Sequence, residues 1–186
     1  MSTFLTATPG QTVGPFFGYA LPFEQGSELV PHGSPGAIRL HGRVTDGLGN
    51  PVPDALLEIW QADADGNVPT ATGALRRDGW TFTGWGRAAT DDEGHYGFTT
   101  VLPGSAKPGA APFISMTIFA RGLLNRLFTR VYLPSERLAE DRLLASLPAE
   151  RRDTLIATSE ARGLRFDVSL QGSNETVFLT YPGHRS

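Results

Sequence analysis

Apolar residues in this chain recur mostly in short runs with the two-residue period of β-strands. The central run, Ala55–Ala62, is apolar at successive positions, which is typical of a strand buried between two layers. The pattern predicts seven strands separated by turns rich in glycine and proline: Ile38–Thr45, Ala55–Ala62, Gly94–Leu102, Phe113–Ala120, Leu127–Leu133, Leu164–Leu170 and Thr176–Thr180. Seven short strands of this kind predict an all-β fold, a β-sandwich.

The first 36 residues lack this alternation and are rich in threonine, proline, glycine and phenylalanine. Because this segment carries large side chains that need burial, we expect an ordered N-terminal arm. Those side chains are Phe16, Phe17, Tyr19, Leu21 and Phe23. Such an arm crosses either its own domain or a partner subunit, and the pattern alone leaves both open. The chain therefore divides into an arm, residues 1–36, and a β-sandwich domain, residues 37–186.

Two further segments interrupt the strand pattern. Residues 65–90 form a predicted packed loop, because a flexible linker rarely carries as many aromatic residues as Trp80, Phe82 and Trp85. A helix is predicted to begin at Pro134, with an acidic residue in its first turn and an apolar face formed by Leu138, Leu143, Leu144 and Leu147. A short second turn is expected at residues 149–157.

Composition narrows the function classes. A chain of 186 residues with 40% hydrophobic residues is long enough for one domain with a substantial core. Its net charge of -3 and pI near 5.8 give no basic surface for nucleic acid or an anionic membrane. It has no cysteine, no recognisable signal peptide and no apolar run long enough to cross a bilayer. We expect a cytoplasmic protein without disulfides.

The residues alone suggest no familiar catalytic centre. A serine nucleophile would need a G-x-S-x-G elbow, which the sequence lacks. The four histidines are His32, His41, His95 and His184, and no two have the spacing that places both rings on one strand face. The acidic segment around Asp63 and Gly66 resembles a calcium loop, but Gln61 and Thr72 occupy its first and last ligand positions. A simple turn explains that segment better.

Three motifs nevertheless carry a resemblance. They are Gly42-x-Val44-x-Asp46-x-x-Gly49-x-Pro51-Val52, Glu58-Ile59-Trp60-Gln61-Ala62-Asp63 with Gly66, and Asp92-x-Gly94-x-Tyr96. Together they resemble the core of the intradiol ring-cleavage dioxygenases, and the likeness extends from residues 11–15 to residues 175–178. This resemblance implies the β-sandwich of that family. It also implies insertion of both atoms of O2 into the ring bond between two hydroxyl-bearing carbons.

The same resemblance shows that this chain differs from the family at the metal-ligand positions. Its members hold a non-haem ferric ion with two tyrosines and two histidines, hard ligands suited to Fe(III). The corresponding positions here are Val68, a position near Ala106, Phe113 and Ser115. The chain therefore resembles the non-iron type of subunit in this family, whose Fe(III) is bound by a partner beta subunit. Tyr96 and Tyr132 remain, but both lie within strand patterns that predict buried aromatic residues.

In that type of enzyme the non-iron subunit helps to enclose the substrate. The matching positions are Thr12, Gly14, Pro15 and Arg121, which the resemblance makes substrate-binding residues. Glycine allows close backbone approach, and a guanidinium fork suits the carboxylate of 3,4-dihydroxybenzoate. The expected product is 3-carboxy-cis,cis-muconate. Without the resemblance, Thr12 would be a turn residue and Arg121 a solvated cation at a strand end.

Two alternatives remain open from the sequence. One is a homomeric intradiol dioxygenase with an atypical metal site, which the four replaced ligands argue against. The other is a transthyretin-like or carbohydrate-type β-sandwich that binds a ligand without catalysis. The iron content of the purified chain distinguishes the homomeric enzyme from the non-iron subunit. An iron-bearing protein that purifies with the chain distinguishes the non-iron subunit from a binding module without catalysis.

Overall fold

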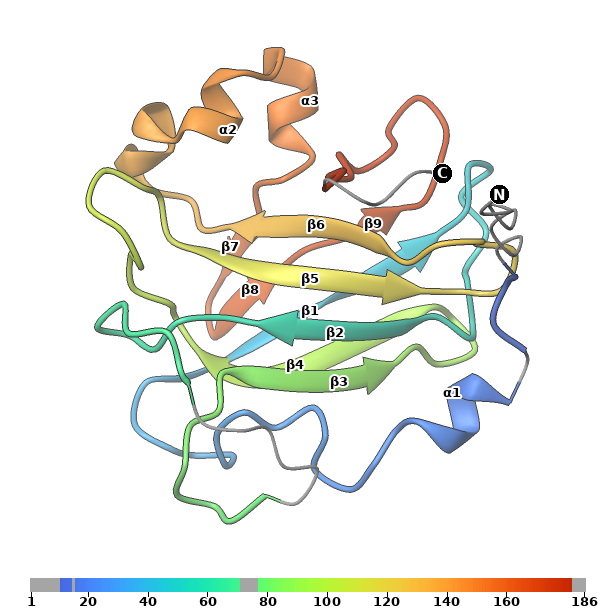
Figure 1. Cartoon of the computed structure of the whole chain (residues 1–186), viewed down its shortest axis with the longest axis horizontal. Helices are drawn as coiled ribbons and strands as arrows, with labels where there is room; N and C mark the ends of the chain where they lie inside the picture. Colours follow the sequence, from blue (N-terminus) through green and yellow to red (C-terminus); the bar gives the residue numbers. More distant parts are fainter. Residues whose placement is uncertain (1–10, 15, 71–76, 182–186) are drawn as a thin grey trace, which may run out of the picture.

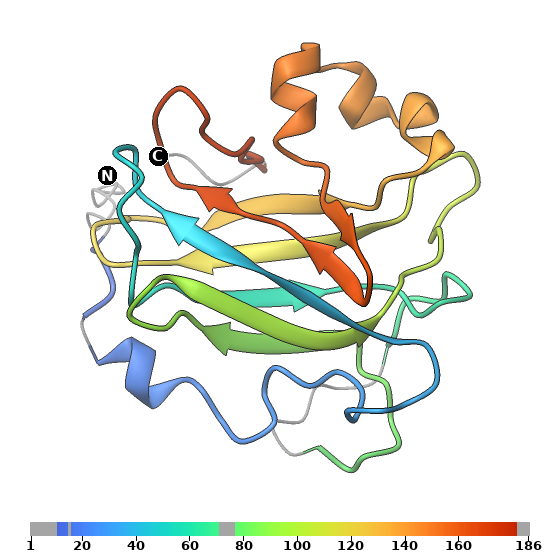
Figure 2. The ribbon, with the colours of Figure 1, turned by 180° about the vertical axis from the view of Figure 1, so that it is seen from behind.

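The computed structural model describes residues 11–14, 16–70 and 77–181, and its strands form two sheets packed face to face (Figure 1). The four-stranded sheet has the order β3-β2-β5-β6 and comprises β2 Leu56–Trp60, β3 Trp85–Ala89, β5 Phe113–Phe119 and β6 Leu127–Tyr132. The five-stranded sheet has the order β4-β1-β8-β7, with β9 also paired to β1 (Figure 2). Its strands are β1 Ala37–Thr45, β4 His95–Val101, β7 Thr158–Glu160, β8 Gly163–Arg165 and β9 Val168–Ser169. The predicted all-β sandwich is confirmed.

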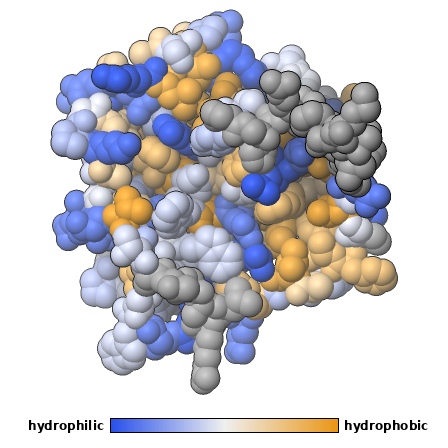
Figure 3. All heavy atoms as spheres, viewed as in Figure 1, coloured by the Kyte–Doolittle hydropathy of each residue, from blue (hydrophilic) through white to orange (hydrophobic). Residues whose placement is uncertain are grey.

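The hydrophobic core lies between the two sheets. Alternate residues of β5, namely Ile114, Met116 and Ile118, are fully buried and pack against Leu40 and Val44 of β1. The opposite face of the four-stranded sheet points away from this core. Figure 3 shows that outer face, on which apolar and hydrophilic side chains lie side by side.

Strand β1 holds the five-stranded sheet together through a close backbone approach at Gly42. Beside it, the N–H of Phe166 donates to the carbonyl of His41 (2.8 Å), and the buried hydroxyl of Tyr96 donates to the carbonyl of Phe166 (2.5 Å). A Cβ atom at Gly42 would overlap that same Phe166 carbonyl. The segment between β8 and β9 can therefore lie against β1 only because residue 42 is glycine.

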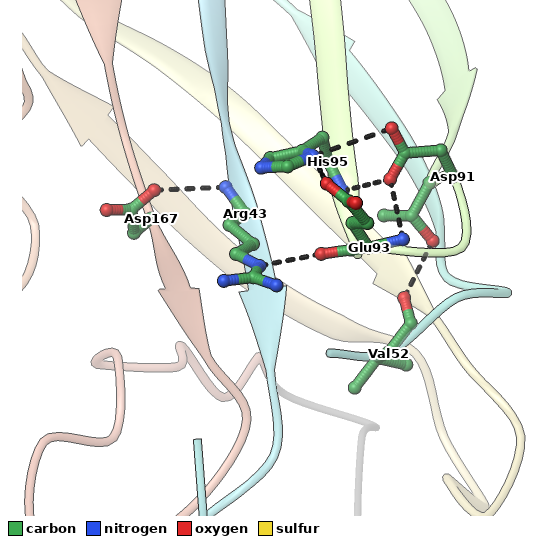
Figure 4. A network of polar contacts seen from close by, with 7 residues as sticks. Arg43, Val52, Asp91, Glu93, His95 and Asp167 are labelled. Atoms are coloured by element: carbon green, nitrogen blue, oxygen red, sulfur yellow. Dashed lines mark hydrogen bonds and ion pairs between the residues drawn. The ribbon is translucent and has the colours of Figure 1, made fainter. Parts of the chain in front are cut away.

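The predicted strand Leu164–Leu170 is divided at this approach. The backbone N–H of Arg43 donates to the carboxylate of Asp167 (3.0 Å), so a side chain replaces a backbone carbonyl in the ladder. On the other side of Arg43, its Nε donates to the carbonyl of Glu93 (2.6 Å) in the turn before β4 (Figure 4). Asp91 stabilises that turn by accepting from the backbone N–H groups of Glu93 and His95. These hydrogen bonds, chiefly that from His95, lower the pKa of Asp91.

The helical region after β6 differs from the prediction. A single helix from Pro134 to Leu147 is wrong, because the chain becomes extended at Asp141. The 3₁₀ helix η1 spans Glu136–Glu140, helix α2 spans Arg142–Ala145, and helix α3 spans Ala149–Asp153. Asp141 caps α2 by accepting from the backbone N–H groups of Leu143 and Leu144. None of the helices among the described residues is long and apolar enough to cross a membrane.

Other elements also differ from the prediction. Strands β3 and β7 were not predicted, and β3 lies inside the segment 65–90 that we expected to be a loop. No strand forms at Thr176–Thr180, although the Leu179 N–H donates to the carbonyl of Phe128 (2.7 Å). Within the predicted packed loop of residues 65–90, Trp80 is 93% exposed and is not packed as expected.

The described part of the N-terminal arm both packs on its own domain and faces solvent. Helix α1, Phe17–Ala20, buries Phe17, and Phe23 stacks on Trp85 with ring centroids 5.8 Å apart. In contrast, Phe16 and Tyr19 are 78% and 86% exposed. The arm is therefore anchored to its own sandwich by some of its aromatic residues and presents the others outward.

The close approach at Gly42 predicts a specific effect of Gly42→Ala. We expect it to lower the free energy of unfolding by about 3 kcal/mol, because the new methyl group displaces the Phe166 backbone. Gly97→Ala in the paired strand β4 is the matched control, since its nearest new contact is 3.6 Å away, and it should change stability by less than about 0.5 kcal/mol. Urea denaturation measures both, and equal effects would contradict the role given to Gly42.

Candidate functional site

Thr12 links the N-terminal arm to the segment that follows β5. Its hydroxyl accepts a hydrogen bond from the backbone N–H of Gly122 (2.7 Å). Two residues later, the carbonyl of Gly14 accepts from the N–H of Phe17 and so begins the turn into α1 (3.2 Å). Pro15 lies outside the described residues. The structure therefore brings Thr12 to the end of β5, next to the residue that follows Arg121, and places Gly14 at the start of α1.

Arg121 lies two residues beyond the end of β5 and is ion-paired. Its Nε contacts the carboxylate of Asp54, in the turn that precedes β2. The side chain of Arg121 is 56% exposed, whereas that of Asp54 is 21% exposed. The guanidinium has five N–H donors, so one carboxylate partner does not use its full hydrogen-bonding capacity.

A hollow of about 210 Å³ lies beside this corner. It is lined by Gln11, Val13, Phe119, Ala120, Leu123, Leu124, Asn125 and Arg126. Two arm residues and the turn after β5 share this lining, so the arm and the sandwich form one surface here. The predicted residues Thr12, Gly14 and Arg121 are sequence neighbours of these lining residues but do not line the hollow themselves.

A larger pocket of about 440 Å³ lies at the other end of β5, on the outer face of the four-stranded sheet. Six residue steps along β5 separate its two ends by about 20 Å. Three positions that the family resemblance aligns with iron ligands, Val68, Phe113 and Ser115, line this pocket, and so does Ala106, near which the fourth falls. Four ligands of one metal must converge on one point, so their convergence supports that alignment.

The side chains at these four positions do not fit a ferric ion. Three are hydrocarbon side chains, and a neutral serine hydroxyl does not replace the tyrosinate and imidazole ligands that stabilise Fe(III). Among residues 11–14, 16–70 and 77–181, no group of three or more His, Cys, Asp and Glu side chains is placed to hold a metal ion. We therefore derive no step of a reaction at iron from this pocket.

A series of hydrogen-bonded polar side chains borders the pocket. Arg130 of β6 donates through Nη1 to the hydroxyl of Tyr132 (3.0 Å), which in turn donates to the carboxylate of Asp141 (3.1 Å). Tyr132 is fully buried, and burial is the main reason that its pKa rises to about 12. Tyr132 therefore stays neutral at physiological pH and orients Arg130.

Sequence reasoning missed Asp54, Arg130 and Asp141. Asp54 is distant in sequence from Arg121, so only the fold shows their pairing. Arg130 alternates with buried Thr129 and Val131, which places it on the outer face, and this alternation was readable from the sequence. Asp141 precedes Arg142-Leu143-Leu144, a helix-start signal that could have been recognised.

Comparisons with known proteins place the chain in a family. It is 40% identical over 196 residues to the protocatechuate 3,4-dioxygenase alpha chain of Burkholderia cepacia, an alignment that covers 95% of this chain and 98% of that one. A family model described as dioxygenase matches residues 12–172. The chain belongs to the intradiol ring-cleavage dioxygenase family. The resemblance carried by the three sequence motifs is confirmed.

Two further similarities agree with this membership. The protocatechuate 3,4-dioxygenase beta chain of Burkholderia cepacia is 35% identical over 168 residues, with 79% of this chain and 70% of that one covered. Among solved structures, the dioxygenase domain of a dioxygenase and carbohydrate-binding protein fusion from Streptomyces sp. SirexAA-E gives a TM-score of 0.59. That match covers 90% of this chain and all of the domain, at 26% identity. The intradiol dioxygenase type of sandwich is thereby confirmed.

The raised pKa of Tyr132 predicts how stability depends on pH. Because the pKa is raised in the folded state from 10.0 to about 12, its stabilising contribution is complete below pH 10 and is lost as the pH rises from about 10 to 12. The full contribution is about 2–3 kcal/mol. Denaturation between pH 8 and pH 12 should therefore show a shallower decline in Tyr132→Phe than in the wild type. Parallel declines would contradict this assignment.

Proposed function

We propose that this chain is the non-iron alpha subunit of a protocatechuate 3,4-dioxygenase. The observation that carries the proposal is the full-length similarity to an alpha chain, together with four ligand-equivalent positions that converge in one pocket without ferric ligands. The enzyme would cleave 3,4-dihydroxybenzoate with O2 and yield 3-carboxy-cis,cis-muconate. As the sequence predicts, it would act in the cytoplasm.

An iron-bearing beta subunit would supply the Fe(III) that activates the catechol for reaction with O2. Such a partner needs a surface on this chain, and the exposed aromatic residues of the arm suit that purpose. Phe16 and Tyr19 face solvent on a segment that Phe17 and Phe23 anchor to the sandwich. Exposed aromatic side chains on an ordered segment are typical of a protein interface.

The role proposed for this chain is to bind and orient the substrate at the corner formed by Thr12, Gly14 and Arg121. Arg121 is 56% exposed and would bind the ring carboxylate through its guanidinium fork. The hydrogen bond from Gly122 to Thr12 holds the arm beside that fork. Gly14 and Pro15 would close the pocket over the substrate, since glycine permits close approach of the backbone.

Co-expression with a beta-type partner tests the proposal. The purified chain alone should contain no stoichiometric iron and should lack the visible colour of an Fe(III)-tyrosinate centre. The complex should contain iron and consume O2 with protocatechuate. One equivalent of iron in an active, coloured preparation of this chain alone would overturn the proposal, as would a monomer that ignores a cognate beta subunit in size-exclusion chromatography.

Substitution of Arg121 tests its role in substrate binding. Arg121→Ala in the complex should raise KM for protocatechuate by about one to two orders of magnitude, because a charge-assisted bidentate pair is worth about 1.5–3 kcal/mol. Arg121→Lys keeps the charge without the fork and should recover only part of the loss. Catechol lacks the carboxylate, so its steady-state kinetics should hardly change.

The ion pair provides the control. If the loss in Arg121→Ala came from breaking the contact with Asp54, then Asp54→Asn would cause the same loss. We expect Asp54→Asn to change KM for protocatechuate by less than about fivefold, because a partly exposed ion pair contributes about 0–1 kcal/mol. Equal losses in both variants, or equal losses on protocatechuate and catechol, would show that Arg121 is structural.

A further inference from the structure

The pocket that contains the four ligand-equivalent positions has the size and lining of a small-molecule site. Its volume of about 440 Å³ lies within the range of about 300–1,000 Å³ typical of ligand pockets. Most of its wall is apolar, and much of it comes from small side chains that leave the space open: Ala62, Val68, Gly104, Ala106, Ala110 and Ala111. Trp60, Phe113 and Tyr181 add aromatic surfaces.

The base of the pocket is a row of side chains across three strands. Ser115 of β5 is paired with Trp60 of β2 on one side and with Arg130 of β6 on the other. Paired residues project to the same face of a sheet, so an aromatic ring, a small hydroxyl and a guanidinium stand next to one another. A planar ligand above Ser115 would therefore have Trp60 at one edge and Arg130 at the other.

Arg130 is held in position but keeps free hydrogen-bonding capacity. Its Nη1 donates to Tyr132, and its guanidinium carbon lies 4.1 Å from the ring centroid of Phe113. Arginine has five N–H donors, so this single hydrogen bond leaves several for a ligand. Within the part of the chain that the structure describes, Arg130 makes no ion pair with a carboxylate.

The remaining charged groups of the lining favour an anion. Lys107 lies in a loop closed by hydrogen bonds from Ser105 and Ala110 to its carbonyl, and its ammonium group is ion-paired to none of the described residues. Asp141 is the acidic residue of the lining, and its Oδ1 already accepts from Tyr132 and two backbone N–H groups. The pocket thus presents two cations and one engaged carboxylate.

We propose that this pocket binds a small aromatic carboxylate, with the carboxylate on Arg130 and the ring above Ser115, beside Trp60. Fork geometry favours a planar carboxylate, and the aromatic walls favour a planar ring. This inference goes beyond the proposed function, because it assigns a binding site at the end of β5 opposite Arg121. It depends only on residues of this chain.

Isothermal titration with benzoate tests this assignment, using the full chain in the assembly in which it purifies. Benzoate lacks the hydroxyl groups that ring cleavage requires, so the readout is independent of activity. We expect benzoate to bind in the millimolar range or tighter, and benzamide, which has the same shape without the charge, to bind at least about tenfold more weakly. Arg130→Gln should weaken benzoate binding by about tenfold or more, whereas Arg137→Gln, on η1 outside the pocket, should leave it unchanged.

A second test uses two variants that introduce the same uncharged side chain, one inside the pocket and one outside it. Their comparison does not depend on a change of charge. Ser115→Leu should fill the pocket and abolish benzoate binding at this site. Thr117→Leu places the same side chain on the same face of β5, two residues away and outside the lining, and should bind like the wild type. Melting temperatures establish that each variant is folded.

Several outcomes would overturn the proposal. They are no benzoate binding at millimolar concentration, equal affinity for benzoate and benzamide, and equal effects of Ser115→Leu and Thr117→Leu. A beta subunit that also binds benzoate would add a second set of sites, but those sites would survive Arg130→Gln and Ser115→Leu. If no beta partner exists, the proposed function fails, yet the same titration of the full chain alone still decides this inference.

Discussion

The fold depends on the contact between Gly42 and the backbone of Phe166. Strand β1 pairs with β4 along one edge and with β8 and then β9 along the other, and the change of partner occurs where Phe166 lies against Gly42. Without that approach the C-terminal strands would lose their register on β1, and the core would lose Leu164 and Val168. A side chain at Gly42 would therefore prevent the C-terminal strands from completing the five-stranded sheet, and one at Gly163 would overlap the carbonyl of Arg39 in the same way. Because the five-stranded sheet covers one face of the four-stranded sheet, only the opposite, outer face of the four-stranded sheet remains for ligands and partners.

Strand β5 connects the two candidate sites of this chain. At its beginning, Phe113 and Ser115 line the larger pocket, and just beyond its end Arg121 and Gly122 meet the arm. Residues 114, 116 and 118 of the same strand are fully buried between the sheets. Because the middle of the strand is fixed by the core, both of its ends are held rigidly, and loops at either end can vary without moving the other.

Much of this architecture follows from sequence patterns, and the exceptions have physical causes. Strands β1, β2, β4, β5 and β6 were predicted within one or two residues, because alternation and flanking turns coincide there. Strand β3 was missed because Gly86 and two alanines give it little β-propensity, and pairing with β2 forms it nonetheless. The prediction of a single helix was wrong because the leucines have helical spacing on both sides of Asp141, and this spacing gives no sign that Asp141 itself is extended.

The candidate site shows a similar limit of prediction. The alignment placed the ligand-equivalent positions from motif spacing, and the structure shows that they lie around one pocket. By contrast, the ion pair between Arg121 and Asp54 joins elements that are distant in sequence. The hydrogen bonds from Arg130 through Tyr132 end at Asp141, where the chain is extended although a helix was predicted. Periodicity assigns a residue to a face of a strand, but it does not indicate which residue from another element will lie opposite.

The location of the larger pocket explains how a metal site can change its chemistry without cost to the fold. Ligand-equivalent Phe113 and Ser115 project from the outer face of β5, while Ile114 and Met116 project into the core, so the two sets vary independently. A buried cavity left by lost ligands would destabilise the protein, but a pocket open to solvent carries little of that penalty. The residues that replace the ligands are small or aromatic, and the nearby cations retain a preference for negative charge. A site that lacks the ligands for Fe(III) can therefore keep the shape that suits an aromatic anion.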